Sequence, residues 1–150
     1  MKLKDKKMLI TDLCARLPYG VYVEHTSSGF MGILHDIDVF RKYNEDGTVK
    51  DYLCYTNFFG DEACKIEYFK PYLFPLSSMT EEQKKELRSE HDKDIKIMSI
   101  CMKKCSEGDN SLIGKNILYN AVDWCNKNHF DYRGLIEMGL AIDATDKNVY

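Results

Sequence analysis

The sequence predicts an α+β chain: an N-terminal helix, an antiparallel sheet of four or five strands or a small barrel, and C-terminal helices packed on one face. Two observations support this fold class. Apolar residues recur at helical spacing near the N-terminus and again in the second half of the chain. The stretch between them is rich in β-branched and aromatic residues, interrupted by turn signals. A chain of 150 residues is long enough to bury one core without metal ions or disulfides.

The first predicted element is a helix over residues 5–17. Leu9 and Leu13 lie on one face at the spacing of a helical turn, as expected for a helix laid on a core. Asp12 and Arg16 fall on the other side, where we expect them to face solvent. A proline and a glycine follow directly and end the helix.

Short strands are expected in the next fifty residues. An Asp-Gly pair at Asp46 and Gly47 is typical of a tight hairpin turn. The predicted strands cover residues 20–25, 30–38, 49–56 and 63–69. Residues 70–76 contain two prolines, which cannot donate to a ladder, so we expect this stretch to cross the sheet edge in extended form.

Helical sequence resumes after residue 77. Thr80 and Gln83 have the spacing of a capping box, and so do Ser78 and Glu81, which predicts a helix that ends near residue 89. Further helices are predicted over residues 111–128 and 131–138, the last one capped by its aspartate. Residues 94–105 also have helical spacing, as a continuation of the preceding helix or as a new one.

These elements predict one domain over residues 1–150. Residues 1–76 form its helix and sheet, residues 77–144 its helical part, and residues 145–150 a polar tail that we expect to fray.

Composition and charge exclude several function classes. A net charge of -3 argues against binding of bulk nucleic acid, which requires clustered cations. The sequence has no apolar run long enough for a membrane span or a signal peptide, so we expect a cytoplasmic protein that does not contact membranes. Its six cysteines are scattered without any Cys-x-x-Cys pair, which predicts reduced thiols and no zinc site.

The common catalytic and cofactor motifs are also absent. We find no phosphate-binding glycine loop, no G-x-S-x-G and no H-E-x-x-H. Cys125 and His129 are four residues apart, the minimum arrangement for a thiol nucleophile. Cys125 lies on the presumed core face, however, where burial raises the pKa of a thiol and makes it inert. We therefore predict a protein that is not an enzyme and needs no cofactor.

Residues 123–144 contain the strongest candidate for a ligand site. The candidate ligand-binding residues are Trp124, His129, Phe130, Tyr132 and Arg133. An arginine beside aromatic rings can hold an anion or a flat base by hydrogen bonding and stacking. The alternative is a helix–turn–helix corner in which the aromatic rings fill the core and Arg133 pairs with Asp131 or a carbonyl.

A second group of aromatic residues is a candidate for contact with a protein partner. Most of the group is expected on the core face of the sheet. Phe58 and Phe59 fall in a turn, where apolar rings are costly to expose, and Tyr72 lies in the proline-containing stretch.

Three blocks of the sequence carry a resemblance to a known group of proteins. The blocks are LCARLPYGV at residues 13–21, KPYLFPLSSMTEEQKKEL at residues 70–87 and DWCNKNHFDYRGLIEMGLAIDA at residues 123–144. They resemble a family of small proteins without assigned function that are abundant in gut anaerobic bacteria and in their phages and prophages. The resemblance implies an accessory cytoplasmic protein of a mobile element, and it provides no catalytic residues to transfer.

In that setting, our leading hypothesis is a protein that binds and sequesters a small nucleotide signal of antiphage immunity. Such a pocket needs only aromatic rings and cations and often lies between subunits, so the hypothesis includes a homo-oligomer. The first alternative is an interaction module that docks on a host or phage protein through the aromatic edge of the sheet. The second is a nucleotide-processing enzyme, which would need a cluster of His or carboxylate side chains.

Overall fold

Helices and strands follow the order expected of an α+β chain. The structure is a computed structural model that describes residues 1–56, 64–89 and 112–150. Its helices are α1 (Leu3–Arg16), α2 (Glu81–Ser89) and α4 (Leu112–Lys127). Three short 3-10 helices, η1 (Leu17–Tyr19), η2 (Ile66–Tyr68) and η3 (Leu76–Ser78), connect elements. The predicted α+β class, with an N-terminal helix, a sheet and a C-terminal helix, is confirmed.

The larger sheet is mixed and is not closed into a barrel. Its strands are β1 (Tyr22–His25), β2 (Met31–Ile33), β6 (Phe69–Pro75), β7 (Phe130–Asp131) and β8 (Ile142–Asp143). Strand β1 pairs with β2 and β6 in antiparallel fashion, whereas β7 and β8 both run parallel to β6. The prediction of a purely antiparallel sheet was wrong because β7 and β8 come from a C-terminal segment that we expected to be helical.

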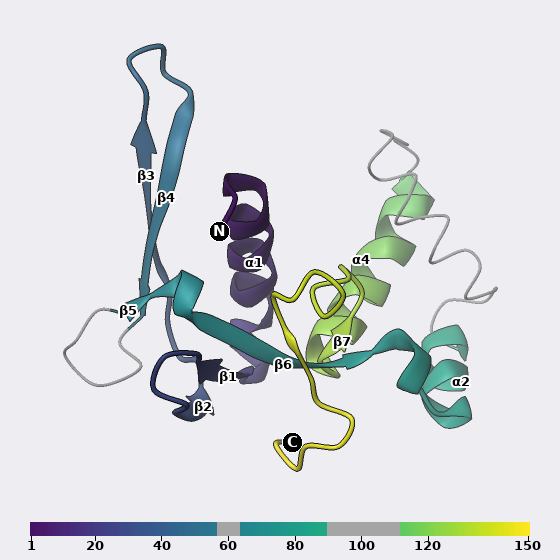
Figure 1. Ribbon diagram of the computed structural model, residues 1–150. Helices are drawn as coiled ribbons and strands as arrows, with labels where there is room; N and C mark the ends of the chain where they lie inside the picture. The colour runs from purple at the N-terminus through teal and green to yellow at the C-terminus, as the bar shows by residue number, and fades with distance from the viewer. Residues whose placement is uncertain (57–63, 90–111) are drawn as a thin grey trace.

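The smaller sheet forms an arm that extends away from the rest of the structure (Figure 1). It consists of β3 (Asp38–Tyr43), β4 (Val49–Thr56) and β5 (Cys64–Lys65) in antiparallel order. The predicted Asp-Gly turn closes the β3–β4 hairpin, with Gly47 at φ +81° and the Asn44 N–H donating to the Thr48 carbonyl at 2.8 Å. Helix α1 lies between β4 and α4 and contacts both (Figure 1).

Strand β6 is the central strand of the larger sheet, although we expected this stretch at an edge. Its first proline, Pro71, pairs with Val23 of β1. The Thr26 N–H donates to the Tyr68 carbonyl at 2.7 Å, and hydrogen-bonded pairs alternate along an antiparallel ladder. The pair of Val23 and Pro71 is therefore one of the pairs that are not hydrogen-bonded, and the missing N–H of the proline leaves no group of β1 without a donor. The other proline is the last residue of β6, where the strand ends.

The predicted helix over residues 131–138 does not form. Residues 130–131 are strand β7, and turns occupy most of the stretch that follows. Gly134 has a φ of +74°, a left-handed conformation that interrupts a helix. The Asp131 carboxylate does not cap a helix but accepts hydrogen bonds from the Leu135 and Ile136 N–H groups, at 2.9 and 2.8 Å, and so stabilises the turn.

Helix α2 begins as the sequence predicts. The Thr80 hydroxyl accepts from the Gln83 N–H at 3.2 Å, and the Gln83 side chain accepts from the Thr80 N–H at 2.9 Å. These two bonds form the predicted capping box. Ser78, the other candidate, instead donates its hydroxyl to the Pro75 carbonyl at 2.8 Å.

Two of the predicted segments cannot be compared with the structure. Phe58, Phe59 and the stretch 94–105 lie outside the described ranges. In the described part of the chain, no helix is long and apolar enough to cross a membrane.

Candidate functional site

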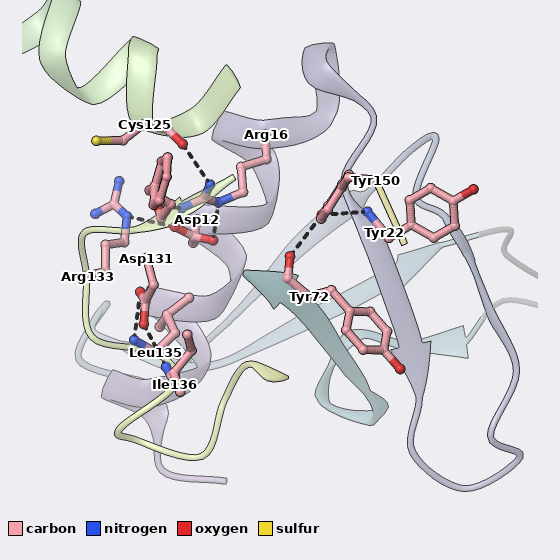
Figure 2. A network of polar contacts seen from close by, with 11 residues as sticks. Asp12, Arg16, Tyr22, Tyr72, Cys125, Asp131, Arg133, Leu135, Ile136 and Tyr150 are labelled. Carbon is pink, nitrogen blue, oxygen red and sulfur yellow. Dashed lines mark hydrogen bonds and ion pairs between the residues drawn. The ribbon is translucent and has the colours of Figure 1, made fainter. Parts of the chain in front are cut away.

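A buried ion pair joins α1 to the C-terminal elements. Asp12 and Arg16 are both fully buried, although the sequence pattern placed them toward solvent. Arg16 donates to both carboxylate oxygens of Asp12, from Nε at 2.7 Å and from a terminal nitrogen at 3.1 Å (Figure 2). Its guanidinium also donates to the carbonyls of Cys125, at 3.3 Å, and Phe130, at 2.8 Å. Arg16 thus binds α1 to the end of α4 and to β7 at the same time.

Arg133 belongs to the same cluster. Its Nε lies 3.2 Å from a carboxylate oxygen of Asp12, and its guanidinium stacks over the Tyr132 ring at 4.7 Å from the centroid. The side chain is 28 % exposed. We had considered Asp131 or a carbonyl as the partner of Arg133, but the observed partner is Asp12. Two guanidinium groups therefore share one buried carboxylate.

His129 lies at the turn between α4 and β7 in a strained backbone conformation. Its φ of +58° is unusual for a residue with a side chain. The side chain is 7 % exposed, and its Nδ1 is a buried atom without a hydrogen-bond partner among the described residues. Burial lowers the pKa of His129 to about 4, and the charge of Arg16 lowers it further. The imidazole is therefore neutral near pH 7.

The Tyr150 ring stacks on this imidazole. The two ring centroids are 4.0 Å apart and the planes differ by 13°. The Tyr150 hydroxyl accepts from the Tyr22 N–H at 3.2 Å and donates to the Tyr72 carbonyl at 2.8 Å (Figure 2). Burial raises the pKa of this hydroxyl to about 12. The tail over residues 145–150 was expected to fray, but its last side chain is fixed by two hydrogen bonds and a ring stack.

These rings line a cavity of about 480 Å³. The aromatic lining consists of Phe74, His129, Phe130 and Tyr150. The polar lining is provided by Lys127 and Asn128 at the end of α4, by Ser78, Thr80 and Gln83 at the start of α2, and by Thr145. The volume is within the usual range for small-molecule sites, and rings facing a few polar groups are their usual lining. We call this space the His129 cavity.

The structure divides the predicted ligand-binding residues between two places. His129 and Phe130 line the cavity. Trp124 lies behind it, with its ring parallel to that of Phe130 at 5.6 Å. Tyr132 and Arg133 are part of the buried ion cluster instead.

Tyr72, the remaining described candidate for partner contact, is a buried side chain. It is 3 % exposed, and its hydroxyl donates to the Glu24 carboxylate. Its ring therefore belongs to the interior of this chain. Lys127, Asn128 and Tyr150 are cavity residues that the sequence analysis did not select. An aromatic residue at the end of a polar segment was the one available signal for Tyr150.

Other groups that could support chemistry are weaker candidates. Burial raises the pKa of Cys125 to about 12, as expected for an inert thiol on the core face. His25 Nδ1 lies 2.8 Å from the Ser28 hydroxyl, within one tight turn, where the same hydroxyl also accepts from the Phe30 N–H. The described part of the chain has no group of three or more His, Cys, Asp or Glu side chains placed to hold a metal ion.

We compared the chain with known protein families, characterised proteins and solved structures. No protein family, no characterised protein and no solved structure matches the chain. The candidate site is therefore defined by its own geometry: a cavity lined by aromatic rings, by polar side chains and by a buried neutral imidazole.

Proposed function

We propose that the protein binds a small nucleotide-like ligand in the His129 cavity and holds it without converting it. The observation that supports this most is the composition of the cavity, in which aromatic rings line the same space as a lysine, amides and hydroxyls. A nucleotide has the same division into a flat ring and a polar, anionic part.

The aromatic lining suits the ring of the ligand. Stacking of a base on an aromatic side chain contributes roughly 1–3 kcal/mol, and it does not depend strongly on which base is bound. Phe74 and Phe130 are packed at 6.0 Å between centroids, and Trp124 supports Phe130 from behind. Phe74 and Phe130 are therefore held in place before binding, which reduces the conformational entropy that is lost when a ligand is held.

The polar lining suits an anionic group. Lys127 provides a cation at the rim of the cavity, and the start of α2 provides the positive end of a helix dipole beside it. Hydroxyls and amides in the same lining can donate further hydrogen bonds to phosphate or sugar oxygens. Because Glu81 is paired with Lys84 at 2.6 Å, its carboxylate charge is partly compensated.

The cavity lining favours binding over catalysis. The residues that line it include no aspartate, glutamate or cysteine within the described part of the chain. The imidazole that lines it has a pKa of about 4, well below the value at which a general base works best near neutral pH. This composition supports a site that retains its ligand.

The resemblance to small proteins of phages and prophages makes the proposal more specific. A mobile element gains from a protein that removes a nucleotide signal of host immunity from the cytoplasm. Such a protein needs affinity and sufficient copies, and it needs no turnover. We therefore propose sequestration of a nucleotide immune signal as the biological role.

Native mass spectrometry of the protein purified from phage-challenged bacteria tests this role. A bound mass of nucleotide size that is released intact on denaturation would support sequestration, and the same spectrum gives the number of subunits. Release of a chemically altered nucleotide would instead indicate an enzyme. A protein that carries no ligand but co-purifies with another protein would indicate a docking module, and the proposal would fail.

Calorimetric titration with AMP, cyclic AMP and ADP-ribose tests the site itself. Lys127→Gln should weaken binding roughly tenfold, since a charge-assisted hydrogen bond contributes about 1.5–3 kcal/mol. Lys147→Gln is the matched control, because this exposed lysine does not line the cavity. Equal affinity of the Lys127 and Lys147 variants would place the ligand elsewhere.

A further inference from the structure

The backbone ladder between β1 and β6 ends at the pair of Val23 and Pro71, next to the Tyr150 hydroxyl. In this antiparallel pair, hydrogen-bonded positions alternate with positions that are not bonded. The Thr26 N–H donates to the Tyr68 carbonyl at 2.7 Å, which fixes the alternation. With Val23 opposite Pro71, the pair of Tyr22 and Tyr72 falls at a bonded position.

At this position a side-chain hydroxyl replaces the direct backbone hydrogen bond. The Tyr22 N–H donates to the Tyr150 hydroxyl at 3.2 Å, and that hydroxyl donates to the Tyr72 carbonyl at 2.8 Å (Figure 2). The hydroxyl is therefore inserted into the ladder, in the way that a water molecule can be. If it withdraws, the Tyr22 N–H and the Tyr72 carbonyl become available to another group that can both accept and donate.

Exchange of Tyr150 for a ligand leaves no backbone group unsatisfied. A ring edge that accepts from the Tyr22 N–H and donates to the Tyr72 carbonyl replaces both hydrogen bonds to Tyr150, and the released hydroxyl bonds to water. A net hydrogen bond contributes only about 0.5–1.5 kcal/mol, so the polar part of the exchange costs little. What withdrawal does lose is the ring stack on His129, at 4.0 Å between centroids. Another flat ring can restore that contact.

Tyr150 also remains accessible from the cavity. Tyr150 is 45 % exposed as a whole residue and lines the same space as Lys127 and Thr145. The imidazole beneath it is 7 % exposed, with a buried Nδ1 that has no partner among the described residues. An entering ligand therefore reaches Tyr150 before it reaches His129.

We propose that the face of His129 covered by Tyr150 is the ring subsite of the cavity, and that the ring of the ligand displaces Tyr150 to occupy it. This inference rests on the proposed function and adds the class of ring that the subsite accepts. The position between the Tyr22 N–H and the Tyr72 carbonyl needs a ring edge with both an acceptor and a donor. Phenols and nucleobases have such an edge, and benzene has none. The subsite thus selects for a hydrogen-bonding flat ring.

Variants of Tyr150 test this inference by the direction in which affinity changes. Tyr150→Ala removes the side chain that competes with the ligand, so AMP should bind at least about fivefold more tightly than to the unaltered protein. Tyr150→Phe retains the stack but loses the inserted hydroxyl, and its affinity should lie between the two. Tyr119→Ala is the matched control, because Tyr119 is exposed on α4 and outside the cavity lining. Weaker or unchanged binding by Tyr150→Ala would overturn the inference.

A second probe separates this inference from the proposed function. 4-Methylphenol has the shape of a tyrosine side chain and carries no phosphate. It should bind Tyr150→Ala and shift the NMR signal of the Tyr22 amide, while benzene and the unaltered protein should show no such shift. If AMP binds every variant equally, the cavity is a nucleotide site but Tyr150 does not cover its ring subsite. If 4-methylphenol shifts the amide and no nucleotide binds any variant, the subsite exists and the proposed nucleotide function fails.

Discussion

Replacing Asp12 with Asn tests whether the buried ion pair holds α1 against the C-terminal elements. The substitution preserves the shape of the side chain but removes the charge that neutralises Arg16, which is fully buried. Arg133 loses the same carboxylate, 3.2 Å from its Nε. Two guanidinium groups then face a neutral amide, and the amide nitrogen is itself a donor. Arg16 retains only carbonyl oxygens and one amide oxygen as acceptors.

Removing one partner of a buried ion pair costs about 3–5 kcal/mol, because the remaining charge stays desolvated. We expect the upper part of this range for Asp12→Asn, since one carboxylate serves two cations. Arg16→Met should cost less, because Asp12 then still has Arg133 as a partner. Domains of this kind are stable by about 5–15 kcal/mol, so Asp12→Asn should remove a large part of the total.

Urea unfolding followed by circular dichroism and by tryptophan fluorescence measures both variants. Trp124 is the only tryptophan, and it stacks on Phe130, whose carbonyl accepts from Arg16. With an m-value of about 1–3 kcal/mol/M, the midpoint should fall by more than about 1 M. Asp5→Asn, in the first turn of the same helix, is the control and should cost under about 1 kcal/mol. A loss below 1 kcal/mol for Asp12→Asn, or a larger loss for Arg16→Met, would refute the reasoning.

Two further predictions concern the cavity and the start of α2. Because burial, aided by Arg16, lowers the pKa of His129 to about 4, the unfolded chain takes up this proton first as the pH falls. The contribution of His129 to stability is therefore full above about pH 6.5 and falls by up to roughly 1.4 kcal/mol per pH unit toward pH 4. His129→Asn, which tolerates the left-handed backbone, should flatten urea midpoints measured between pH 7 and 4.5, and an unchanged slope would contradict the assignment. Thr80→Ala should destabilise the protein by about 1 kcal/mol, since it removes the acceptor of the Gln83 N–H. Ser78→Ala leaves the capping box intact, so an equal loss in thermal unfolding would argue against the box.

The sequence was most informative where a signal acts within a few residues. The capping box at Thr80 and the turn at Gly47 both form as predicted, because their hydrogen bonds join residues three or four positions apart. Helix α1 also ends within one residue of the predicted position. Local bonding of this kind depends little on the rest of the fold.

The spacing of apolar residues could not predict that two charged residues of α1 are buried. The helical pattern assigns a face to each residue, and it assumes that charged residues face water. Asp12 and Arg16 do not, since the carbonyls that complete the shell of Arg16 belong to residues 125 and 130, more than a hundred positions along the chain. No local pattern contains that information. Strands β7 and β8 were missed for the same reason. Each consists of only two residues, which are strands because they pair with the distant strand β6.

The sequence predicted only some of the residues that line the candidate site. The segment around His129 was selected for its aromatic and basic residues, and two of its five candidates do line the cavity. The rest of the cavity comes from elements that are distant in sequence. Tyr150 reaches it by bonding to Tyr22 and Tyr72, which are 128 and 78 residues away.

The buried ion pair and the cavity are parts of one arrangement. The Phe130 carbonyl accepts from Arg16, and the neighbouring His129 carbonyl accepts from the Phe74 N–H at 2.9 Å. The backbone on either side of this peptide is thus fixed by α1 and by β6, which explains how His129 keeps a φ of +58°. A left-handed residue with a side chain persists only where its surroundings determine it, and such residues are common at binding sites. Weakening the ion pair should therefore disturb the imidazole before it unfolds the chain. Asp12 does not line the cavity, yet its loss should reduce ligand affinity at temperatures where the protein is still folded.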